Sequence, residues 1–520
     1  MNFLNKIVSK DLYAYLFILG LALIVFGNAM GGEFLYDDLL LIVENEFTKS
    51  FAHFVDWFTS SSTSGAGREL GNLWRPLPSA VYTLIYSLFG LSPAMHHITN
   101  IILHSINGYL VYKLLDKFSI EKIWCLLAAL IFIVHPVQAE SVSYISGLPD
   151  VLSTLFVLLA LNSYAEISDK KPTQLIKTGG FFVLALLTKE SVVVLFPLAI
   201  LIDIFNWQNY GAREKNFRKK SLALLGAMTL IFIIAKFTIL NFNKDLALTH
   251  EKNPYTEHVY VRLITFTSIL IQYVKLLVYP LHLYIDKEQT VFTTLLKPQG
   301  LAGLAILGTI LIGSYRSFKN KRFFMLAGLW FLCALIPVSG IILTNSMYFE
   351  HWLYLPIIGL LIMLAAALNN LNSHNQKIAI TVLLLVAVLF GTRTIIRNRD
   401  WHDAITFFKH ELKYTENPGR VHHQIGTAYL RADNYPEAIN ELKVATSLNQ
   451  ENVDTQFSLC LAYYLNKQLP LAGIECQKAL QIDPSHKASM MTLYNIAVTT
   501  GNLPLASELN QKLRAIGVTQ

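Results

Sequence analysis

The chain opens with the apolar run LYAYLFILGLALIVFGNAM at residues 12–30, and GGEFLYDD follows at residues 31–38. A run of this length forms a helix that can cross the hydrocarbon core of a bilayer. Lys6 and Lys10 precede it, so a cleaved signal peptide is the alternative interpretation. The later topology needs this helix as an anchor, and we therefore expect it to be the first of several spans.

The composition extends the membrane assignment to the whole chain. Of its 520 residues, 53% are hydrophobic and 15% are charged, and the mean hydropathy is +0.43. Soluble domains carry about 25% charged residues. The net charge of +7 would also suit a nucleic-acid partner, but the basic residues gather in short runs between apolar segments, as at residues 213–220. Such runs mark cytoplasmic loops, and we expect no nucleic-acid partner.

Apolar stretches recur through residues 1–397 and predict an all-α, polytopic transmembrane bundle. The stretches 76–90 and 258–280 are ambiguous, and charge decides between the alternatives. If neither crosses the membrane, the main basic runs all face the cytoplasm. This bias favours about eleven spans, with both ambiguous stretches along the outer interface. The expected spans are 12–30, 94–115, 122–138, 148–165, 176–188, 191–206, 221–240, 298–316, 322–343, 352–370 and 377–396.

Hydrophobicity drops at residues 393–401, and a period of 34 residues follows. The recurring positions are Ala438, Ala472, Ala506, Tyr429 and Tyr463. Gly426 and Pro484 occupy small-residue and helix-ending positions, as in tetratricopeptide repeats. The pattern predicts an α-solenoid at 398–520, with repeats near 419–452 and 453–486 and a partial one at 487–516. Generic amphipathic helices are the alternative.

The four cysteines predict no metal site, because none of them shows CxxC spacing. Cys125 and Cys333 lie in apolar stretches and are expected to be small core residues. Cys460 and Cys476 would be able to pair if the repeat region is extracytoplasmic.

Asp37 and Asp38 lie just past the first span, on the side that this topology places outside. Carboxylates accept protons from hydroxyl groups, so one of them is a candidate general base with an orienting neighbour. The alternative is an N-cap for the helix that Leu39 begins.

Two basic residues lie at the same boundary. Arg75 follows Trp74 and is suited to grip a phosphate, or else it belongs to an interfacial Trp–Arg belt. Lys189 offers a point charge to a lipid phosphate, or else it neutralises the adjacent Glu190.

Three further polar residues are candidates for the site. His135 and Glu140 belong to a polar run that interrupts two spans, which is either functional or a solvated turn after Pro136. His351 lies beside aromatic residues and is a candidate for a head-group contact. Asp37, Asp38, His135 and Glu140 lack metal-ligand spacing, and we expect no metal.

Five motifs follow one another along the chain, and the repeats come after them. The motifs are Phe-x-Tyr-Asp-Asp, Trp-Arg-Pro, His-Pro-x-x-x-Glu, Thr-Lys-Glu and Glu-His-Trp-Leu-Tyr-Leu-Pro. In this order, they resemble those of the transmembrane-and-tetratricopeptide O-mannosyltransferases and their bacterial relatives. That family belongs to the GT-C class of membrane glycosyltransferases. The resemblance implies inverting transfer of a sugar from a polyprenyl-phosphate carrier to a hydroxyl, with a protein Ser or Thr as the leading acceptor. It implies no cofactor, and an extracytoplasmic active site and repeat domain on a bacterial inner-membrane protein.

The resemblance also implies roles for individual residues. Asp37 would be the base, and Asp38 would orient the acceptor or the donor. Three residues would bind the carrier phosphate, and two would line the site: Arg75, Lys189 and His351 for the phosphate, His135 and Glu140 for the lining. The repeats would offer a groove to a protein. Leu148 stands where the family commonly has arginine, so Asp150 is expected to lack its usual partner.

Three other functions remain open. The acceptor would be a lipid-linked or surface polysaccharide if the enzyme is a ligase. The chain would be a non-enzymatic scaffold if it only presents its repeats, but the clustering of polar groups on one side argues against this. A lipid-linked sugar transporter would show paired halves, and the sequence shows no such symmetry.

Overall fold

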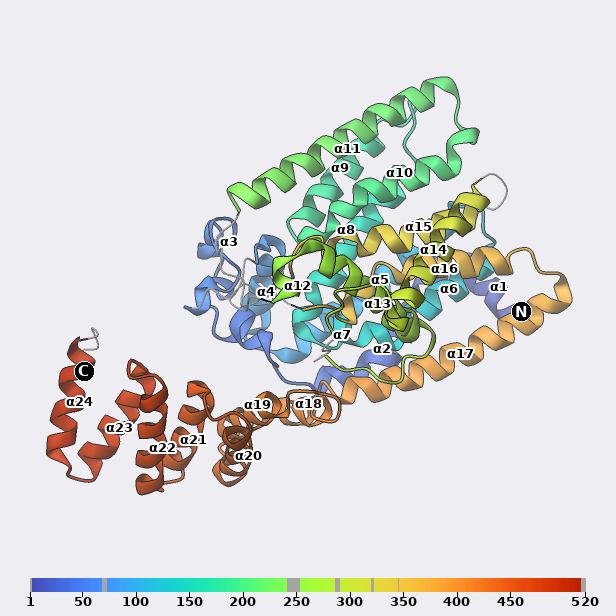
Figure 1. Cartoon of the computed structure of the whole chain (residues 1–520). Coiled ribbons are helices and arrows are strands. Elements are labelled where there is room, and N and C mark those ends of the chain that lie inside the picture. The colour runs from blue at the N-terminus through green and yellow to red at the C-terminus, as the bar shows by residue number, and fades with distance from the viewer. Residues whose placement is uncertain are drawn as a thin grey trace. The chain divides into compact units, whose positions relative to one another are not determined.

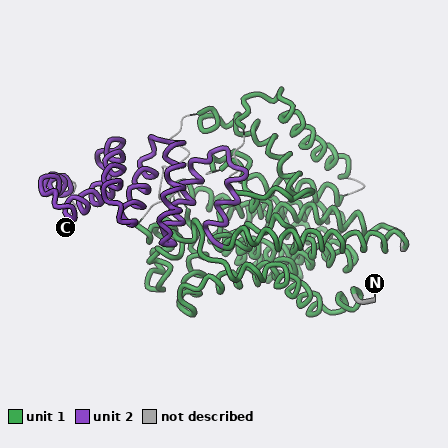
Figure 2. The backbone as a smooth tube through the Cα atoms, turned by 90° about the horizontal axis from the view of Figure 1, so that it is seen from below, with its two compact units in different colours: residues 1–402 green, residues 403–520 purple. Residues whose placement is uncertain are grey.

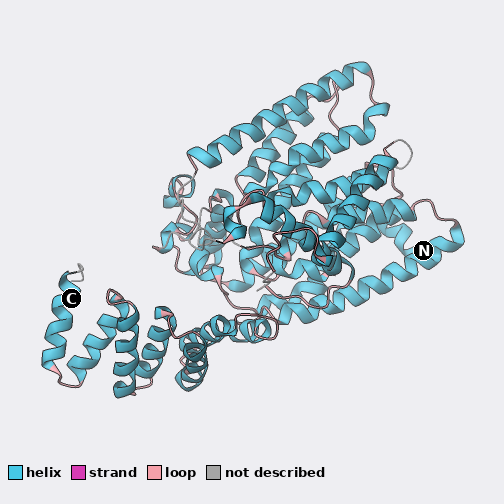
Figure 3. Ribbon diagram, in the orientation of Figure 1, coloured by secondary structure: helices cyan, strands magenta, loops and turns pink. Residues whose placement is uncertain are grey.

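The computed structural model describes residues 2–67, 73–240, 253–285, 290–318, 322–344 and 346–515. The chain divides into two compact units, Met1–His402 and Asp403–Gln520 (Figure 2). Every regular element of the described residues is a helix (Figure 3). The predicted boundary at residue 397 falls two residues before the end of a long helix, so the structural division comes slightly later.

The first unit contains seventeen α-helices within the described residues (Figure 1). They are α1 (Asn2–Val8), α2 (Asp11–Phe26), α3 (Asp56–Thr59), α4 (Pro76–Phe89), α5 (Pro93–Asp116), α6 (Lys122–Val134), α7 (Ala139–Val142), α8 (Leu148–Ala165), α9 (Thr173–Leu186), α10 (Leu195–Asn206), α11 (Ala212–Thr238), α12 (Pro254–Glu257), α13 (Val259–Val278), α14 (Pro298–Ser317), α15 (Arg322–Leu335), α16 (Ile357–Leu368) and α17 (Ser373–Arg399). Each of the eleven stretches expected to span the membrane coincides with one of these helices.

Seven helical segments in the described part of the chain are long and apolar enough to cross a membrane. They contain α2, α8, α10, α11, α13, α14 and α17. Helix α6 and the turn after it form an eighth candidate, bent by 51° where Pro136 interrupts the helix. Helices α9, α15 and α16 are apolar but shorter. These lengths establish a polytopic membrane fold.

Helix α5 is 24 residues long but falls outside this set, because polar side chains interrupt its apolar sequence. Several of those side chains are buried and bond to residues outside α5. The Asn100 amide donates to the Tyr144 carbonyl (3.2 Å), and the Asn107 amide donates to the Val151 carbonyl (2.8 Å). A helix that neighbouring helices surround does not need a uniformly apolar surface, so α5 is a polar interior helix.

Helix α13 passes the length test, although the sequence predicts that residues 258–280 do not cross. At its end, the carbonyl of Leu277 lies 3.0 Å from Nε2 of His135, which follows α6. At its start, Nε of Arg262 donates to the carbonyl of Gly340 (2.6 Å) in the segment between α15 and α16. That segment and the turn after α6 are joined through His351 and Glu140. Both ends of α13 therefore contact loops at one end of the bundle, which favours a helix lying across that end.

The centre of the bundle is α6, in which residues 123–134 are all buried. Helices α2, α5, α16 and α17 pack around it, α8 packs on α5 and α9, and α15 packs on α10, α14 and α16. Apolar burial dominates this packing. Because α6 ends inside the packed bundle, the polar residues that follow it are buried. Some of these buried polar residues form part of the candidate site.

The second unit is a row of helices in which each packs on the next. They are α18 (Ala404–Glu411), α19 (Pro418–Arg431), α20 (Tyr435–Leu448), α21 (Val453–Leu465), α22 (Leu469–Ile482), α23 (Lys487–Thr499) and α24 (Leu503–Ala515). Contacts recur at intervals of 34 residues. Lys409 lies over the ring of Tyr429, and Lys443 over that of Tyr463, at 5.3 and 5.7 Å. The turn residues Asp433, Lys467 and Gly501 all have positive φ. The sequence period is therefore also a structural period.

Gly426 makes the close packing of α19 on α20 possible. A Cβ atom at this position would lie 2.5 Å from Cγ of Leu442. We expect Gly426→Ala to destabilise the pair by about 1–3 kcal/mol, because overpacking forces side chains and backbone to shift. Hydrogen exchange of α19 and α20 in the full chain measures this. Gly473→Ala is the matched control, since its Cβ would meet nothing closer than 4.0 Å. Equal protection in both variants would contradict the packing argument.

Candidate active site

Asp38 ties the first loop to the segment after α7. Its Oδ2 accepts the backbone N–H of Leu35 (2.8 Å), and its Oδ1 accepts the backbone N–H of Ser146 (2.8 Å) and also bonds the Ser146 hydroxyl. The side chain is completely buried. Asp38 makes no side-chain bond to the turn that follows it, so the N-cap interpretation is wrong. The bonds to Leu35 and Ser146 assign Asp38 to positioning the loop.

Asp37 lies at the exposed side of the same turn. The preceding Tyr36 has φ of 49°, a left-handed conformation that costs about 1–3 kcal/mol for a non-glycine residue. The bonds of Asp38 hold this turn in place. The backbone N–H of Asp37 donates to the Tyr144 hydroxyl (2.9 Å). Asp37 is therefore held by its backbone, and the residue keeps exposed surface.

Charges and burial act on the Asp37 carboxylate in opposite directions. The residue has exposed surface, but protein surrounds its carboxyl group, and this desolvation raises the pKa of Asp37 above the ordinary value. A side-chain hydrogen bond with Tyr144 and the electrostatic effects of Arg75 and His351 lower the pKa of Asp37. The net shift is upward, so Asp37 is a stronger base than an ordinary aspartate.

Burial raises the pKa of Asp38 from 3.8 to about 7, against the lowering effect of its hydrogen bonds. The folded state then binds this proton more tightly, so stability falls as pH rises from about 4 to about 7 and levels off above. We expect Asp38→Asn to lose less thermal stability than the parent chain between pH values of about 5 and 8. Thermal unfolding in detergent tests this, with Glu33→Gln as the control that should follow the parent. An identical pH dependence in Asp38→Asn and the parent would contradict it.

Glu140 holds His351 by two bonds. Its Oε2 accepts the backbone N–H of His351 (2.9 Å), and its Oε1 lies 2.7 Å from Nδ1 of the ring. Glu140 is buried, whereas His351 is partly exposed. The structure thus places Glu140 behind His351, where it fixes the orientation of the imidazole, and His351 is the member of the pair that faces the site.

His135 was expected at the donor site, but both of its ring nitrogens face backbone atoms. Nδ1 accepts the N–H of Val137 (3.3 Å), and Nε2 faces the carbonyl of Leu277 (3.0 Å). The ring is buried and packs against Phe390 at 4.7 Å. These contacts assign His135 to joining α6, α13 and α17.

Lys189 and Glu190 do not neutralise one another. Lys189 pairs with Asp150 at 2.5 Å, and Glu190 pairs with Arg75 at 3.4 Å. Asp150 therefore has a cationic partner in Lys189, although position 148 holds leucine and not the family's arginine. Lys236 of α11 adds a third positive charge near Glu190. The cluster carries more positive than negative charge.

A cavity of about 40 Å³ lies beside the ion pair of Lys189 and Asp150. Its lining includes Asp150, Ser153, Lys189, Ser191 and His351. This volume holds about one water molecule, whose share of the liquid is about 30 Å³. The ion pair of Lys189 and the ring of His351 thus border one small cavity whose lining is otherwise mostly apolar, and a sugar phosphate would need this cavity to widen.

The sequence motifs contain two contributors that were not assigned a role, Tyr144 and Ser146. Glu350 and Arg397 were also missed. Glu350 is completely buried and accepts the N–H of Tyr284 (2.7 Å), while Arg397 lies 3.9 Å from Glu350 and 3.1 Å from Asp400. The sequence signal that could have identified Arg397 is the position of an arginine near the end of an apolar helix. In the described residues, no cluster of His, Cys, Asp and Glu is arranged to hold a metal ion.

Fold and site together define an all-α polytopic membrane protein with carboxylates and cations gathered at one end of its helices. The family described as dolichyl-phosphate-mannose-protein mannosyltransferase matches residues 75–239. A protein O-mannosyl-transferase of Caenorhabditis elegans, F38B6.6, is 25% identical over 80% of the chain and 60% of its own length. The human protein O-mannosyl-transferases TMTC3 and TMTC4 are 22% and 24% identical, over 86% and 84% of the chain and 52% and 66% of their own lengths.

These comparisons confirm the resemblance that the motifs indicate: the chain is similar to the TMTC-type protein O-mannosyl-transferases over at least 80% of its length. It spans only about half to two thirds of those relatives.

Proposed function

We propose that the chain is a GT-C-type membrane glycosyltransferase that moves a sugar from a polyprenyl-phosphate donor to a hydroxyl group of a protein. The observation that carries the proposal is the carboxylate of Asp37, a residue with exposed surface, held in the field of Arg75 and His351. The relatives that are named protein O-mannosyl-transferases support a sugar and a protein acceptor.

In the proposed reaction, Asp37 accepts the proton of a Ser or Thr hydroxyl. The acceptor oxygen forms a bond to the anomeric carbon while the bond from that carbon to the carrier's phosphate oxygen breaks. The bonding electrons leave with the phosphate, and the anomeric centre is inverted. One carboxylate suffices for this displacement, which agrees with the placement of Asp38 away from the surface. Asp38 positions Asp37 by fixing the turn to which both residues belong.

The leaving phosphate requires positive charge that is already in place when the bond breaks. Arg75 and Lys189 are such groups, and His351 lies on the same cavity as Lys189. Glu190 and Asp150 hold the two cations in position without consuming all of their donors, since an ammonium has three N–H bonds and a guanidinium five. We propose that the phosphate binds as an additional partner of these ion pairs.

The proposed site lies on the extracytoplasmic side. Helix α11 carries the basic run 213–220 near its start and Lys236 near its end. Lys236 lies 16 residues after Lys220, so about 24 Å of helix separates the two regions, which is most of the roughly 30 Å thickness of the hydrocarbon core. Because basic runs favour the cytoplasm, the end of α11 near Glu190 and Arg75 would face outward.

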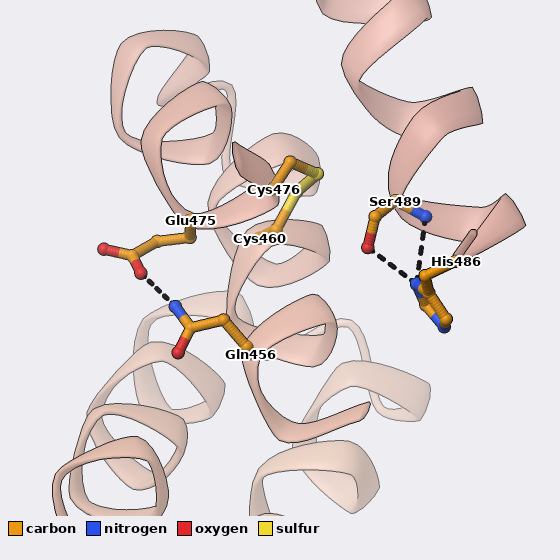
Figure 4. Close-up of a disulfide and its surroundings, with 6 residues drawn as sticks. All are labelled: Gln456, Cys460, Glu475, Cys476, His486 and Ser489. Carbon is orange, nitrogen blue, oxygen red and sulfur yellow. Dashed lines mark hydrogen bonds between the residues drawn. A yellow bond between two sulfur atoms is a disulfide. The ribbon is translucent and has the colours of Figure 1, made fainter. Parts of the chain in front are cut away.

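A disulfide supports the same side for the second unit. Cys460 of α21 and Cys476 of α22 are bonded, and both are buried (Figure 4). Structural disulfides persist in oxidising compartments such as the periplasm. We therefore propose that the second unit is extracytoplasmic in a bacterial inner-membrane protein.

The orientation is tested with a cysteine at Ser447, which is exposed on α20. We expect a membrane-impermeant thiol reagent to label it in cells whose inner membrane is intact. Labelling that requires permeabilisation of the inner membrane would contradict the proposal. The buried Cys125 serves as the unlabelled reference.

We further propose that the second unit is a tetratricopeptide-repeat solenoid that binds a polypeptide segment, either the acceptor or a partner protein. Its recurrent helix pairs support this, because stacked repeats form extended concave surfaces. Paired polar side chains recur at equivalent positions of two repeats. His422 pairs with Glu441, and Gln456 pairs with Glu475. They provide polar groups beside the apolar helix contacts.

Mass spectrometry tests the proposed reaction directly. Envelope proteins and glycans are compared between cells that express the parent chain, cells without it, and cells with Asp37→Asn. We expect a hexose on Ser or Thr peptides only with the parent chain. A change confined to polysaccharide would overturn the protein acceptor, and unchanged proteins and glycans would overturn the enzymatic proposal.

A further inference from the structure

The first loop carries an exposed apolar face made of Phe51, Phe54 and Val55, here called the loop face. The backbone from residue 51 to residue 59 turns helically, through a 3-10 turn at Phe51–His53 and then α3. Residues spaced i, i+3 and i+4 lie on the same side of such turns. The three residues are 50%, 56% and 66% exposed. The loop face is thus a continuous apolar surface.

The loop face rests on a fixed aromatic platform. Trp57 is buried beneath it, with ring centroids 5.8 Å from Phe51 and 5.7 Å from Phe54. The Trp57 indole N–H donates to the carbonyl of Phe47 (2.8 Å). Because Trp57 is anchored in this way, Phe51 and Phe54 are supported from below in their exposed positions.

The polar side chains of the segment lie apart from the loop face. His53 and Asp56 pair with one another, with Nδ1 and Oδ2 2.7 Å apart. At 100° per residue, they project from the side opposite to Phe51 and Phe54. The segment is therefore amphipathic, and the side chains of its polar side are paired with each other.

The aromatic platform continues to a membrane-length helix. Phe58 packs against Trp74, and Trp74 packs against Phe232 of α11, each at 6.4 Å between ring centroids. Phe232 lies six residues before the end of α11, or about 9 Å along the helix axis. Leu230, Ile231 and Ile234 beside it are exposed apolar residues on a helix long enough to cross a membrane. The platform therefore lies near the end of α11 (Figure 1), and this end would mark a boundary of the hydrocarbon core where α11 crosses the membrane.

We propose that the loop face inserts into the interfacial region of the lipid bilayer, on the side of the membrane that carries the candidate site. Contiguous exposed apolar surface rimmed by polar groups marks an interaction site, and an amphipathic segment at a membrane boundary buries its apolar side among head groups and acyl chains. Continuity with the lipid-facing surface of α11 identifies lipid as the occupant. The loop also carries Asp37 and ends at Arg75, so insertion would fix the depth of both.

The experiment measures the surroundings of a nitroxide label on the full chain in phospholipid nanodiscs. Phe54→Cys carries the label in a Cys333→Ser background, and Val55→Cys replaces it if Phe54→Cys does not fold. The accessibility of the label to two paramagnetic reagents is measured. Oxygen concentrates in lipid, whereas a nickel chelate concentrates in water. Ile231→Cys is the lipid reference, Ser447→Cys is the aqueous reference, and Asp56→Cys is the control on the opposite side of the same segment.

We expect the Phe54 label to show high oxygen and low nickel accessibility, as at Ile231, and the Asp56 label to be more accessible to nickel. Nickel accessibility like that at Ser447 would overturn the proposal, because the loop face would then lie in water. Exclusion of both reagents would also overturn it, because protein, either a second copy or a polypeptide ligand, would then cover the loop face.

Discussion

Replacing Asp37 by asparagine is expected to lower the rate of sugar transfer by about 10²- to 10⁴-fold, which is the usual contribution of a positioned general base. Asparagine has nearly the same shape and keeps the backbone N–H that donates to Tyr144. The loop and the donor site should therefore remain intact. Initial rates with a polyprenyl-phosphate hexose and a Ser/Thr peptide measure the effect, and donor binding is measured separately.

Glu33→Gln is the matched control, because Glu33 is an exposed acid four residues earlier in the same loop. We expect its activity to equal that of the parent. The parent's activity should also fall on acidification at a pH above the ordinary titration range of aspartate, because the pKa of Asp37 is raised. Full activity in a correctly folded Asp37→Asn chain would end the assignment of the base.

Much of the fold could be predicted because apolar length alone specifies a membrane helix. Helix α5 shows where hydropathy gives incomplete information. Asn100, His104 and Asn107 are tolerated because they bond to residues outside α5, as His104 does with the Tyr354 hydroxyl at 2.6 Å. Such partners are distant in the sequence, so hydropathy alone cannot distinguish a polar interior helix from a weakly apolar one.

The partners of the charged groups could not be predicted from neighbouring residues. Lys189 has an extended backbone conformation, with φ of −156° and ψ of 138°. Side chains of successive residues in such backbone point to opposite sides. Lys189 and Glu190 therefore pair with Asp150 and Arg75, which are distant in the sequence.

Polar residues at the ends of helices were predicted as a group but not by role. His135 and Asp38 satisfy backbone groups, whereas Asp37 and His351 remain partly accessible. Buried N–H and C=O groups need partners, and a histidine or an aspartate supplies one as readily as it contacts a ligand. Residue type and spacing do not separate these two uses, because only the three-dimensional positions of the free backbone groups decide.

Arg75→Gln is expected to lower the rate of transfer by about 10²- to 10³-fold, the usual cost of removing one fixed donor that stabilises developing negative charge. Arg75 keeps donors for a phosphate. Its Nη2 is 3.4 Å from Glu190, a long contact, and its Nε is buried with no hydrogen-bond partner in the described part of the chain. Glutamine keeps a polar side chain but removes the charge and the guanidinium geometry.

The double variant Arg75→Gln, Glu190→Gln separates catalysis from structure. If Arg75 only neutralised Glu190, the loss in Arg75→Gln would come from an unpaired buried carboxylate, and removing that carboxylate would restore activity. If Arg75 stabilises the leaving phosphate, the double variant stays as slow as Arg75→Gln, because the charge that the phosphate needs is still absent. We expect the second result, mainly as a lower kcat, whereas Glu190→Gln alone retains most of the activity. Recovery to the parent's rate in the double variant would show that Arg75 acts only through Glu190.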